Sequence, residues 1–221
     1  MNKNDVFQAV KKAKIVDKKT IILGLCKDKT VLDVGCVGQD YSYNNPQWLH
    51  NQIRKVSSHV DGVDIVQEGI DLLKQEGFSI FHANELSKLN KKYDIILMSD
   101  VIEHVNDPVH FLEYYAEYLG NNGQILITTP NANGIRNFSS IIVRNDYSLN
   151  PEHTFWFCPK TITEVTKRAK LEFVDFFWLK EYFNLKQVKG FKQKIIFLFN
   201  SSLMKLRKNF CPNFLYIITR K

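Results

Sequence analysis

VLDVGCVGQD, at residues 31–40, is the stretch of sequence that decides the fold. A short apolar run that ends in glycine is typical of a buried strand entering a tight turn. Gly35 and Gly38 let the backbone pass close to a ligand and leave amide N–H groups free to point at it. We therefore predict a strand over residues 30–35 that leads into a ligand-binding loop.

Strands and helices alternate beyond this stretch. Further strands are predicted over 60–65, 78–82, 93–99, 124–129, 172–180 and 214–219, and helices over 4–26 with a break near Asp17, 45–57, 67–75, 107–119 and 161–170. Residues 131–158 have no clear period and are predicted to form a long loop. The alternation predicts an α/β fold, with a mostly parallel sheet, helices on both faces, and two final strands antiparallel to each other.

The composition fits a globular chain of one domain. Its 221 residues are 44% hydrophobic, and no apolar run approaches the roughly 20 residues that a membrane-spanning helix needs. The N-terminus lacks the apolar core of a signal peptide. The four cysteines form no C-x-x-C pair, so we expect a reduced, cytoplasmic protein.

Polar side chains follow the predicted strands. Asp64 ends the second strand, where a carboxylate can accept two hydrogen bonds from a ribose diol. Asn84 follows the third strand, where its side chain could meet an adenine amine, and Ser99 and Asp100 follow the fourth. Because ligands bind beyond the carboxyl ends of parallel strands, we expect these residues to share one site.

In these motifs the chain resembles the class I S-adenosylmethionine (SAM)-dependent methyltransferases. The resemblance covers residues 28–180 and is carried by VLDVGCVGQD (31–40), GVDI (62–65), ANEL (83–86), YDIILMSDVIEHV (93–105) and GQILITTPN (123–131). It implies a Rossmann-like seven-stranded sheet with an antiparallel last strand, and SAM as the cofactor. The cofactor-binding residues that it predicts are Asp33, Gly35, Cys36, Gly38, Asp64, Ile65, Asn84, Glu85, Ser99 and Asp100. Within this set it assigns the 33–38 loop to the methionine part of SAM, and it places Asp100 under the reacting centre.

The glycine loop departs from the family pattern. The usual loop reads D/E-x-G-x-G-x-G, whereas Val37 and Gln39 stand at the second and third glycine positions, with Gly38 between them. A catalytically idle binding protein on the same fold is therefore an alternative. A dehydrogenase is disfavoured, because its G-x-G-x-x-G fingerprint is absent. Nucleic acid is disfavoured as a substrate, because SDVI stands where an N/D-P-P-Y/F motif is expected.

A narrower resemblance concerns the methyl acceptor. The GCVG loop, WLH (48–50), TTPN (128–131) and NPEH (150–153) look like methyltransferases of bacterial surface-glycan pathways. We therefore expect O-methylation of a sugar or another glycan-pathway hydroxyl. Methyltransferases of the ubiquinone pathway share the EHV segment, so a quinone precursor or a small metabolite is the alternative acceptor.

Two histidines are candidate general bases. Histidine can remove a proton near neutral pH, and methyl transfer to a hydroxyl group benefits from such a base. His104 follows the fourth predicted strand, and His153 lies between a glutamate and three aromatic residues in the 131–158 loop. Each could instead order its loop through hydrogen bonds. The other four histidines are interpreted as structural residues without acidic partners, namely His50, His59, His82 and His110. No metal site is expected, because the sequence has no H-x-x-x-H and no paired cysteines.

Charge is unevenly distributed along the chain. The net charge is +7, yet residues 182–221 contain nine Lys or Arg and no Asp or Glu. We divide the chain into an N-terminal helical segment (1–29), a core (30–181) and a basic helical insertion (182–212) before the last strand. Residues 186–210 are predicted to form an amphipathic helix that could contact an anionic membrane or a lipid-linked acceptor. The alternative is a helix whose apolar face packs on the domain. The residues of that predicted face are Val188, Phe191, Ile195, Leu198, Phe199 and Leu206.

Overall fold

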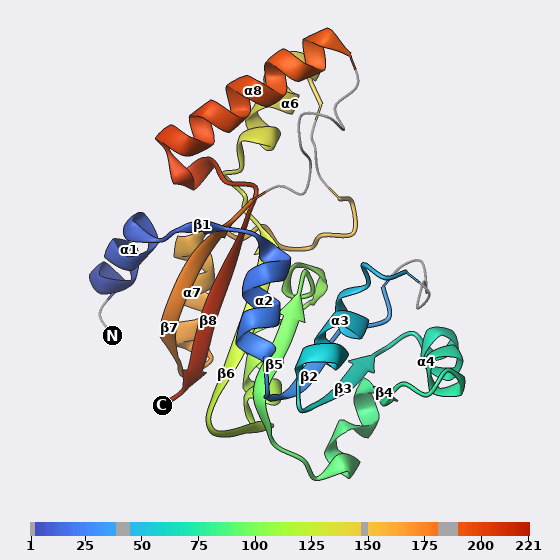
Figure 1. Cartoon of the computed structure of the whole chain (residues 1–221). Coiled ribbons are helices and arrows are strands. Elements are labelled where there is room, and N and C mark those ends of the chain that lie inside the picture. Colours follow the sequence, from blue (N-terminus) through green and yellow to red (C-terminus); the bar gives the residue numbers. More distant parts are fainter. Residues whose placement is uncertain (1–2, 39–44, 147–149, 181–189) are drawn as a thin grey trace.

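A twisted sheet forms the centre of the molecule in the computed structural model, which describes residues 3–38, 45–146, 150–180 and 190–221 (Figure 1). The strands lie in the order β1-β7-β8-β6-β5-β2-β3-β4. They are β1 (Ile15–Val16), β2 (Thr30–Val34), β3 (His59–Asp64), β4 (Ile80–His82), β5 (Tyr93–Ser99), β6 (Leu119–Pro130), β7 (Leu171–Leu179) and β8 (Asn213–Arg220). The predicted Rossmann-like α/β sheet is confirmed, and the two-residue β1 adds one strand to its edge.

The pairing of the strands follows the predicted pattern. Strands β4, β3, β2, β5 and β6 are parallel, and β8 runs antiparallel to both β6 and β7. The extra strand arises where we predicted a break in the N-terminal helix. Asp17 caps the second of two helices there by accepting a hydrogen bond from the Thr20 amide at 2.8 Å, and the residues just before it pair with β7.

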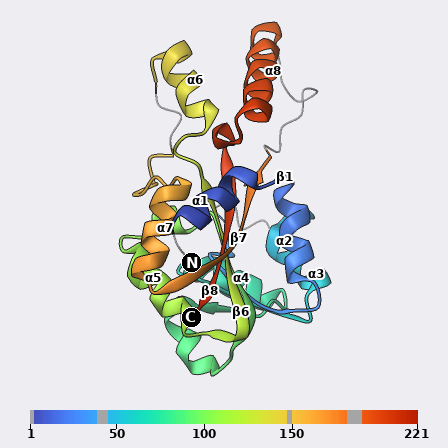
Figure 2. The ribbon, with the colours of Figure 1, turned by 90° about the vertical axis from the view of Figure 1, so that its left-hand side faces the viewer.

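Helices cover both faces of the sheet (Figure 2). The described residues form helices α1 (Lys3–Lys12), α2 (Lys18–Cys26), α3 (Leu49–Val56), α4 (Gln67–Gln75), α5 (Pro108–Ala116), α6 (Ile135–Arg144), α7 (Pro159–Arg168) and α8 (Phe191–Leu206), with short 3-10 turns η1 (Ala83–Leu89), η2 (Ile102–His104) and η3 (Lys208–Phe210). Residues of α1, α5 and α7 share a core with alternate strand positions such as Ile96 and Met98. The positions between them, such as Ile95 and Leu97, pack toward α2 and α3. Burial on both faces explains why these strands are continuously apolar.

Two helices were predicted wrongly, and strand β6 begins at Leu119 and not at 124. Residues 131–158 were predicted to be a loop, but they contain α6. The helix predicted from Asn45-Pro46 begins only at Leu49, because Asn45 caps a turn by accepting a hydrogen bond from the Gln47 amide at 2.8 Å. In both places a short polar-flanked segment carried too little local signal to fix the helix start.

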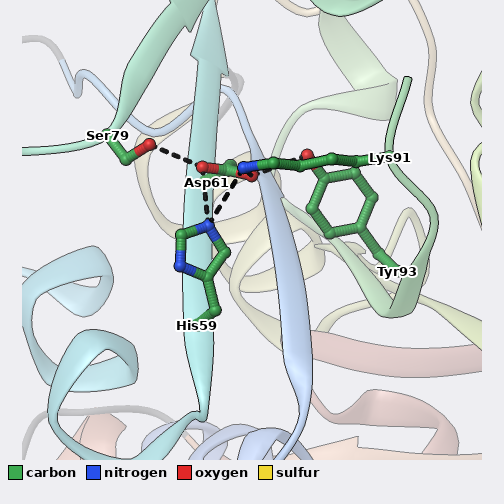
Figure 3. A network of polar contacts seen from close by, with 5 residues as sticks. All are labelled: His59, Asp61, Ser79, Lys91 and Tyr93. Atoms are coloured by element: carbon green, nitrogen blue, oxygen red, sulfur yellow. Dashed lines mark hydrogen bonds and ion pairs between the residues drawn. The ribbon is translucent and has the colours of Figure 1, made fainter. Parts of the chain in front are cut away.

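A buried carboxylate joins three strands near the amino ends of the parallel strands (Figure 3). Asp61 of β3 is fully buried. It accepts hydrogen bonds from the Tyr93 hydroxyl at 2.8 Å and from Lys91 Nζ at 2.8 Å, with Ser79 and His59 as further partners at 2.5 and 2.9 Å. The pKa of Asp61 is lowered: burial by itself raises it, but these four hydrogen bonds to the carboxylate outweigh burial. The charged form is therefore the stable one in the fold.

Candidate functional site

The predicted site residues lie together at the carboxyl edge of the parallel strands. Val34, the last residue of β2, pairs with Val63 on β3 and with Met98 on β5. The residues that follow these positions therefore emerge side by side, and they include Gly35, Asp64 and Ser99. Asp64 pairs in turn with His82 on β4, which brings Asn84 to the same edge.

Gly35 begins the loop after β2 and could not be another residue without rearrangement. Its φ is +72°, in the left-handed region that favours glycine. A Cβ built on it would lie 2.6 Å from Cγ2 of Val101, which follows β5. Gly38 has a φ of +33° and open space around it. Both glycines thus adopt a positive φ, but the Gly35 amide, which was predicted to be free for a ligand, donates to the Val63 carbonyl at 2.8 Å. Residues 39–44 lie outside the described part of the chain.

Val37 explains the departure of this loop from the usual pattern. Its side chain is buried in a small cluster with Ile70, Leu73 and Ile80, under helix α4. Its amide donates a hydrogen bond to Oδ2 of Asp64 at 2.9 Å. The valine therefore faces the protein interior and not the ligand edge, so a glycine is not needed at this position.

Asp33 and Cys36 anchor the loop after β2 through contacts with helix α3 and with the residue before it. Asp33 is buried and lies 2.9 Å from Nδ1 of His50 on α3, while Trp48 Nε1 donates to the Cys36 carbonyl at 3.0 Å. Burial raises the pKa of the Cys36 thiol well above its ordinary value, so the thiol is neutral. The expectation that His50 has no acidic partner was wrong. It was wrong for His59 as well, which lies 2.9 Å from Asp61. Asp33 comes from strand β2, 17 residues before His50, whereas Asp61 lies only two residues after His59 on the same strand, β3.

The other predicted cofactor residues differ in exposure and in the hydrogen bonds that they form within the protein. The Asp64 carboxylate accepts from the amides of Val37 and Ile65, and the Ile65 side chain is 76% exposed at the edge. Asn84 is exposed in η1. The Glu85 carboxylate, in contrast, accepts from the His82 amide at 3.4 Å and completes a capping box at the start of η1. Glu85 thus has a structural role that the sequence did not predict.

Asp100 is held in a fixed position after β5. Its φ is +58°, its amide donates to the Thr128 carbonyl at 3.0 Å, and Oδ1 accepts from the Thr128 hydroxyl at 3.0 Å. Oδ2 pairs with Nζ of Lys18, a buried residue in the first turn of α2. Sequence reasoning missed Lys18, because a single lysine 82 residues away in the chain gives no local signal.

His104 and His153 come together although they are distant in sequence. The loop that carries His153 is fixed to η2 by three hydrogen bonds to the Glu103 carbonyl: from the amide and the hydroxyl of Thr154 at 2.9 and 3.1 Å, and from the Phe155 amide at 3.1 Å. The two imidazole rings lie edge to face with 4.6 Å between their centroids. Within the described residues, neither imidazole has a hydrogen-bond partner, so both keep their nitrogen atoms available.

The charges of this cluster are set by burial. Desolvation is the main cause that lowers the pKa of His153, and the neighbouring His104 adds to the effect. The imidazole of His153 is therefore a neutral proton acceptor near neutral pH. Burial also raises the pKa of Glu103 to about 8, with the Asp100 charge adding to it. Glu103 is almost fully buried; its Oε2 accepts from the Thr129 hydroxyl at 3.0 Å and its Oε1 has no partner.

The same three residues could hold a metal ion, although no metal site was expected. One donor atom from each of Glu103, His104 and His153 lies within 4.8 Å of the others. A carboxylate with two imidazoles is a set that binds zinc and other divalent transition metals. The linear sequence gave no such spacing, because the glutamate and His153 lie 50 residues apart and meet only through the loop contacts.

Comparison with known proteins identifies the fold family. The methyltransferase domain family matches residues 11–175. The chain belongs to this methyltransferase family. The architecture agrees: a SAM-dependent methyltransferase structure from Archaeoglobus fulgidus superposes with a TM-score of 0.59 at 15% identity, covering 99% of this chain and 100% of that one. A second, from Clostridium acetobutylicum, gives 0.52 at 13% identity, covering 92% and 88%.

Curated relatives of this methyltransferase carry a more specific name. A ubiquinone biosynthesis O-methyltransferase of Pelagibacter ubique is 28% identical over 136 residues, which are 56% of this chain and 50% of that protein. Its counterpart in Cereibacter sphaeroides is 26% identical over 159 residues, 66% of this chain and 61% of that protein. The methyltransferase therefore spans about half to three-fifths of the length of these relatives.

SAM is the cofactor of this methyltransferase family, and the residues at the edge fit it. The positive-φ glycine at position 35 lets the loop after β2 pack closely against Val101, which follows β5 at the same edge. The Asp64 carboxylate accepts hydrogen bonds from three backbone amides, and an ionised carboxylate offers about four acceptor sites, so about one site is left for a ligand. Asp64 could thus accept one hydrogen bond from a ribose hydroxyl of SAM, which is the role predicted for it.

Replacing Asp64 by alanine is expected to weaken SAM binding by about 1–3 kcal/mol, or roughly fivefold to 150-fold. The variant loses the charged acceptor for the ribose and the anchor of the Val37 amide. Asp64→Asn keeps one carbonyl oxygen and should lose less. Calorimetric titration with SAM measures the affinity, and Asp71→Ala, which removes an exposed carboxylate of α4, is the matched control. An unchanged affinity of Asp64→Ala would contradict the assignment.

Replacing Glu103 by glutamine is expected to remove a pH dependence of stability. The pKa of this residue is raised from the usual 4.5 to about 8, chiefly by burial. A raised pKa means that the folded state holds the proton more tightly. Its stabilising effect is then complete at acidic pH and is lost as the pH rises through about 8. Urea unfolding across this range should show stability falling with pH in the wild type and a flatter profile in Glu103→Gln. Parallel profiles would disprove the buried, neutral carboxyl.

Proposed function

We propose that this protein transfers the methyl group of SAM to a hydroxyl acceptor, with the His104–His153 pair taking up the acceptor proton. The observation that carries the proposal is the position of the pair. It lies beside Asp100 at the carboxyl edge of the sheet, and the lowered pKa of His153 leaves its imidazole ready to accept a proton. Bound SAM would supply an electrophilic methyl group on a sulfonium.

The residues of the chain contribute alignment and proton transfer. Methyl transfer needs the nucleophile, the methyl group and the sulfur in line, and it needs water excluded. The hydrogen bonds from Thr154 and Phe155 to the Glu103 carbonyl fix the His153 loop over this edge. Once protonated, His153 would be stabilised by the charges of Asp100 and Glu152, which favour its charged form.

A sugar hydroxyl of a glycan pathway is the acceptor that we propose. The sequence motifs of the GCVG loop and of NPEH support it. Phe155 and Trp156 lie two and three residues after His153 and are 37% and 38% exposed, so they offer aromatic faces on which a sugar ring can pack. A phenolic quinone precursor is the second candidate, because the curated relatives bear that name and the same aromatic faces accommodate a planar ring.

The proposal is tested by methyl transfer from radiolabelled SAM to two acceptor panels. One panel contains nucleotide sugars and free glycans, and the other contains catechols and hydroxybenzoates. We expect label in an ether of one panel. A parallel reaction with a chelator tests the Glu103–His104–His153 cluster for a bound metal. Loss of turnover in the chelator would mean that a metal ion activates the acceptor hydroxyl and that the histidines do not take up its proton. Label appearing only on nitrogen or carbon would refute O-methylation.

A further inference from the structure

Helices α6 and α8 form an arm that stands apart from the rest of the molecule. Both views place the two helices beyond the carboxyl edge of the parallel strands, away from the helices that cover the sheet (Figures 1 and 2). The segments that connect the arm to the sheet are joined at Asn131, which is buried. Its Nδ2 donates to the carbonyls of Asn209 and Cys211 at 2.8 Å each. The arm therefore leaves the domain from one fixed point next to the proposed site.

The arm gathers most of the exposed large apolar side chains. Of fourteen such residues in the described part of the chain, nine lie on these two helices. On α8 they recur at i, i+4, i+7 and i+8, which is one helical face. Exposure reaches 82% at Ile142 and 78% at Phe191. The residues are Phe138, Ile141, Ile142 and Val143 on α6, and Phe191, Ile195, Leu198, Phe199 and Leu206 on α8.

The sequence prediction for this region is thereby corrected in part. Within the described residues the amphipathic helix begins at Phe191, because Gly190 has a φ of +87° and precedes the first helical turn. Val188, assigned to the same face, lies outside the described residues. The alternative that the apolar face packs on the domain does not hold, since its described members are at least half exposed.

The charge of the arm is of one sign. Neither α6 nor the whole of residues 182–221 contains an acidic residue. Lys194 and Lys205 are exposed, and at 100° per residue both fall along one edge of the apolar face of α8; Arg207 is exposed just past its end. Two copies of this chain joined through the same face would bring these like charges together. An anionic surface, in contrast, neutralises them.

We propose that the α6–α8 arm docks onto an anionic lipid bilayer. Its apolar residues would enter the boundary between headgroups and acyl chains, while the lysines and the arginine meet the lipid phosphates. Each basic residue near such a surface adds an electrostatic attraction, and this attraction is screened by salt. The arm lies on the surface and does not cross it: among the described residues, no helix is long and apolar enough to span a membrane. Docking would hold the carboxyl edge of the sheet, and hence the proposed site, close to the membrane.

Co-sedimentation with vesicles tests this docking independently of any catalysis. We expect the protein to pellet at low salt with vesicles of phosphatidylglycerol and phosphatidylcholine in equal parts. We expect it to stay in solution with pure phosphatidylcholine, or when salt is high. A triple variant, Lys194→Glu, Lys205→Glu and Arg207→Glu, should lower the partition coefficient at least about tenfold. So should the double variant Ile195→Ser and Phe199→Ser, because it removes the inserted apolar residues.

Matched controls separate the arm from net charge. The triple variant Lys27→Glu, Lys29→Glu and Lys55→Glu makes the same charge change with exposed lysines at the opposite end of the sheet, and it should pellet like the wild type. Three results would each overturn the proposal: no pelleting at low salt, equal pelleting with neutral vesicles, or equal loss in both triple variants. A dimer seen by sedimentation equilibrium and abolished by Ile195→Ser and Phe199→Ser would assign the face to a second copy instead.

Discussion

Replacing His153 by alanine is expected to lower the rate of methyl transfer by about 10²–10⁴-fold, the range typical for loss of a general base. The reason is that the imidazole of His153, whose pKa burial lowers, is the proton acceptor that we propose for this site. Affinity for SAM should stay unchanged, because the predicted cofactor contacts come from β2, β3, β4 and β5. Single-turnover rates with the acceptor found in the labelling assay, together with calorimetry for SAM, measure the two effects.

His104 and His153 should behave as one unit. His104→Ala is expected to lower the rate as well, and the double variant should lose less than the product of the two single losses, because residues in contact do not act independently. His110→Ala is the matched control, since this histidine is exposed on α5 outside the cluster. Normal turnover in both single variants would mean that catalysis rests on positioning alone.

Replacing Asp61 by alanine is expected to destabilise the fold by about 3–5 kcal/mol, the cost of leaving buried partners of a charged group uncompensated. The Tyr93 hydroxyl, in a side chain that is 1% exposed, would lose its acceptor, and Lys91 would lose its counter-charge. Asp71→Ala, on the surface of α4, should change stability by less than about 0.5 kcal/mol. Urea denaturation of both variants measures the difference.

The effect of Asp61 should depend on pH in a defined direction. Its pKa is lowered in the folded state, so the stability it contributes is present at neutral pH and is lost as the pH falls through the folded pKa. The gap in stability between the wild type and Asp61→Ala should therefore narrow in acid. A gap that stays constant down to acidic pH would show that the loss comes from packing and not from the charged hydrogen bonds of Figure 3.

The sequence alone determined the sheet and the line of residues at its edge. Each parallel strand is a short apolar run with a polar residue after it, and these local patterns suffice to place Gly35, Asp64 and Asp100 at strand ends. Because parallel strands align their carboxyl ends, the residues had to meet wherever the strands paired. The sequence also identified the apolar and basic residues of α8, since both signals lie within one helix.

Tertiary structure alone decided which side chains face one another. His153 reaches His104 because the amides of Thr154 and Phe155 bond to the Glu103 carbonyl, a contact across about fifty residues of chain. Lys18 reaches Asp100 because α2 packs on the sheet beside β5. The tertiary structure also determines that the apolar face of α8 stays exposed. A helix pattern shows which face is apolar, but whether that face is covered depends on where the rest of the chain packs.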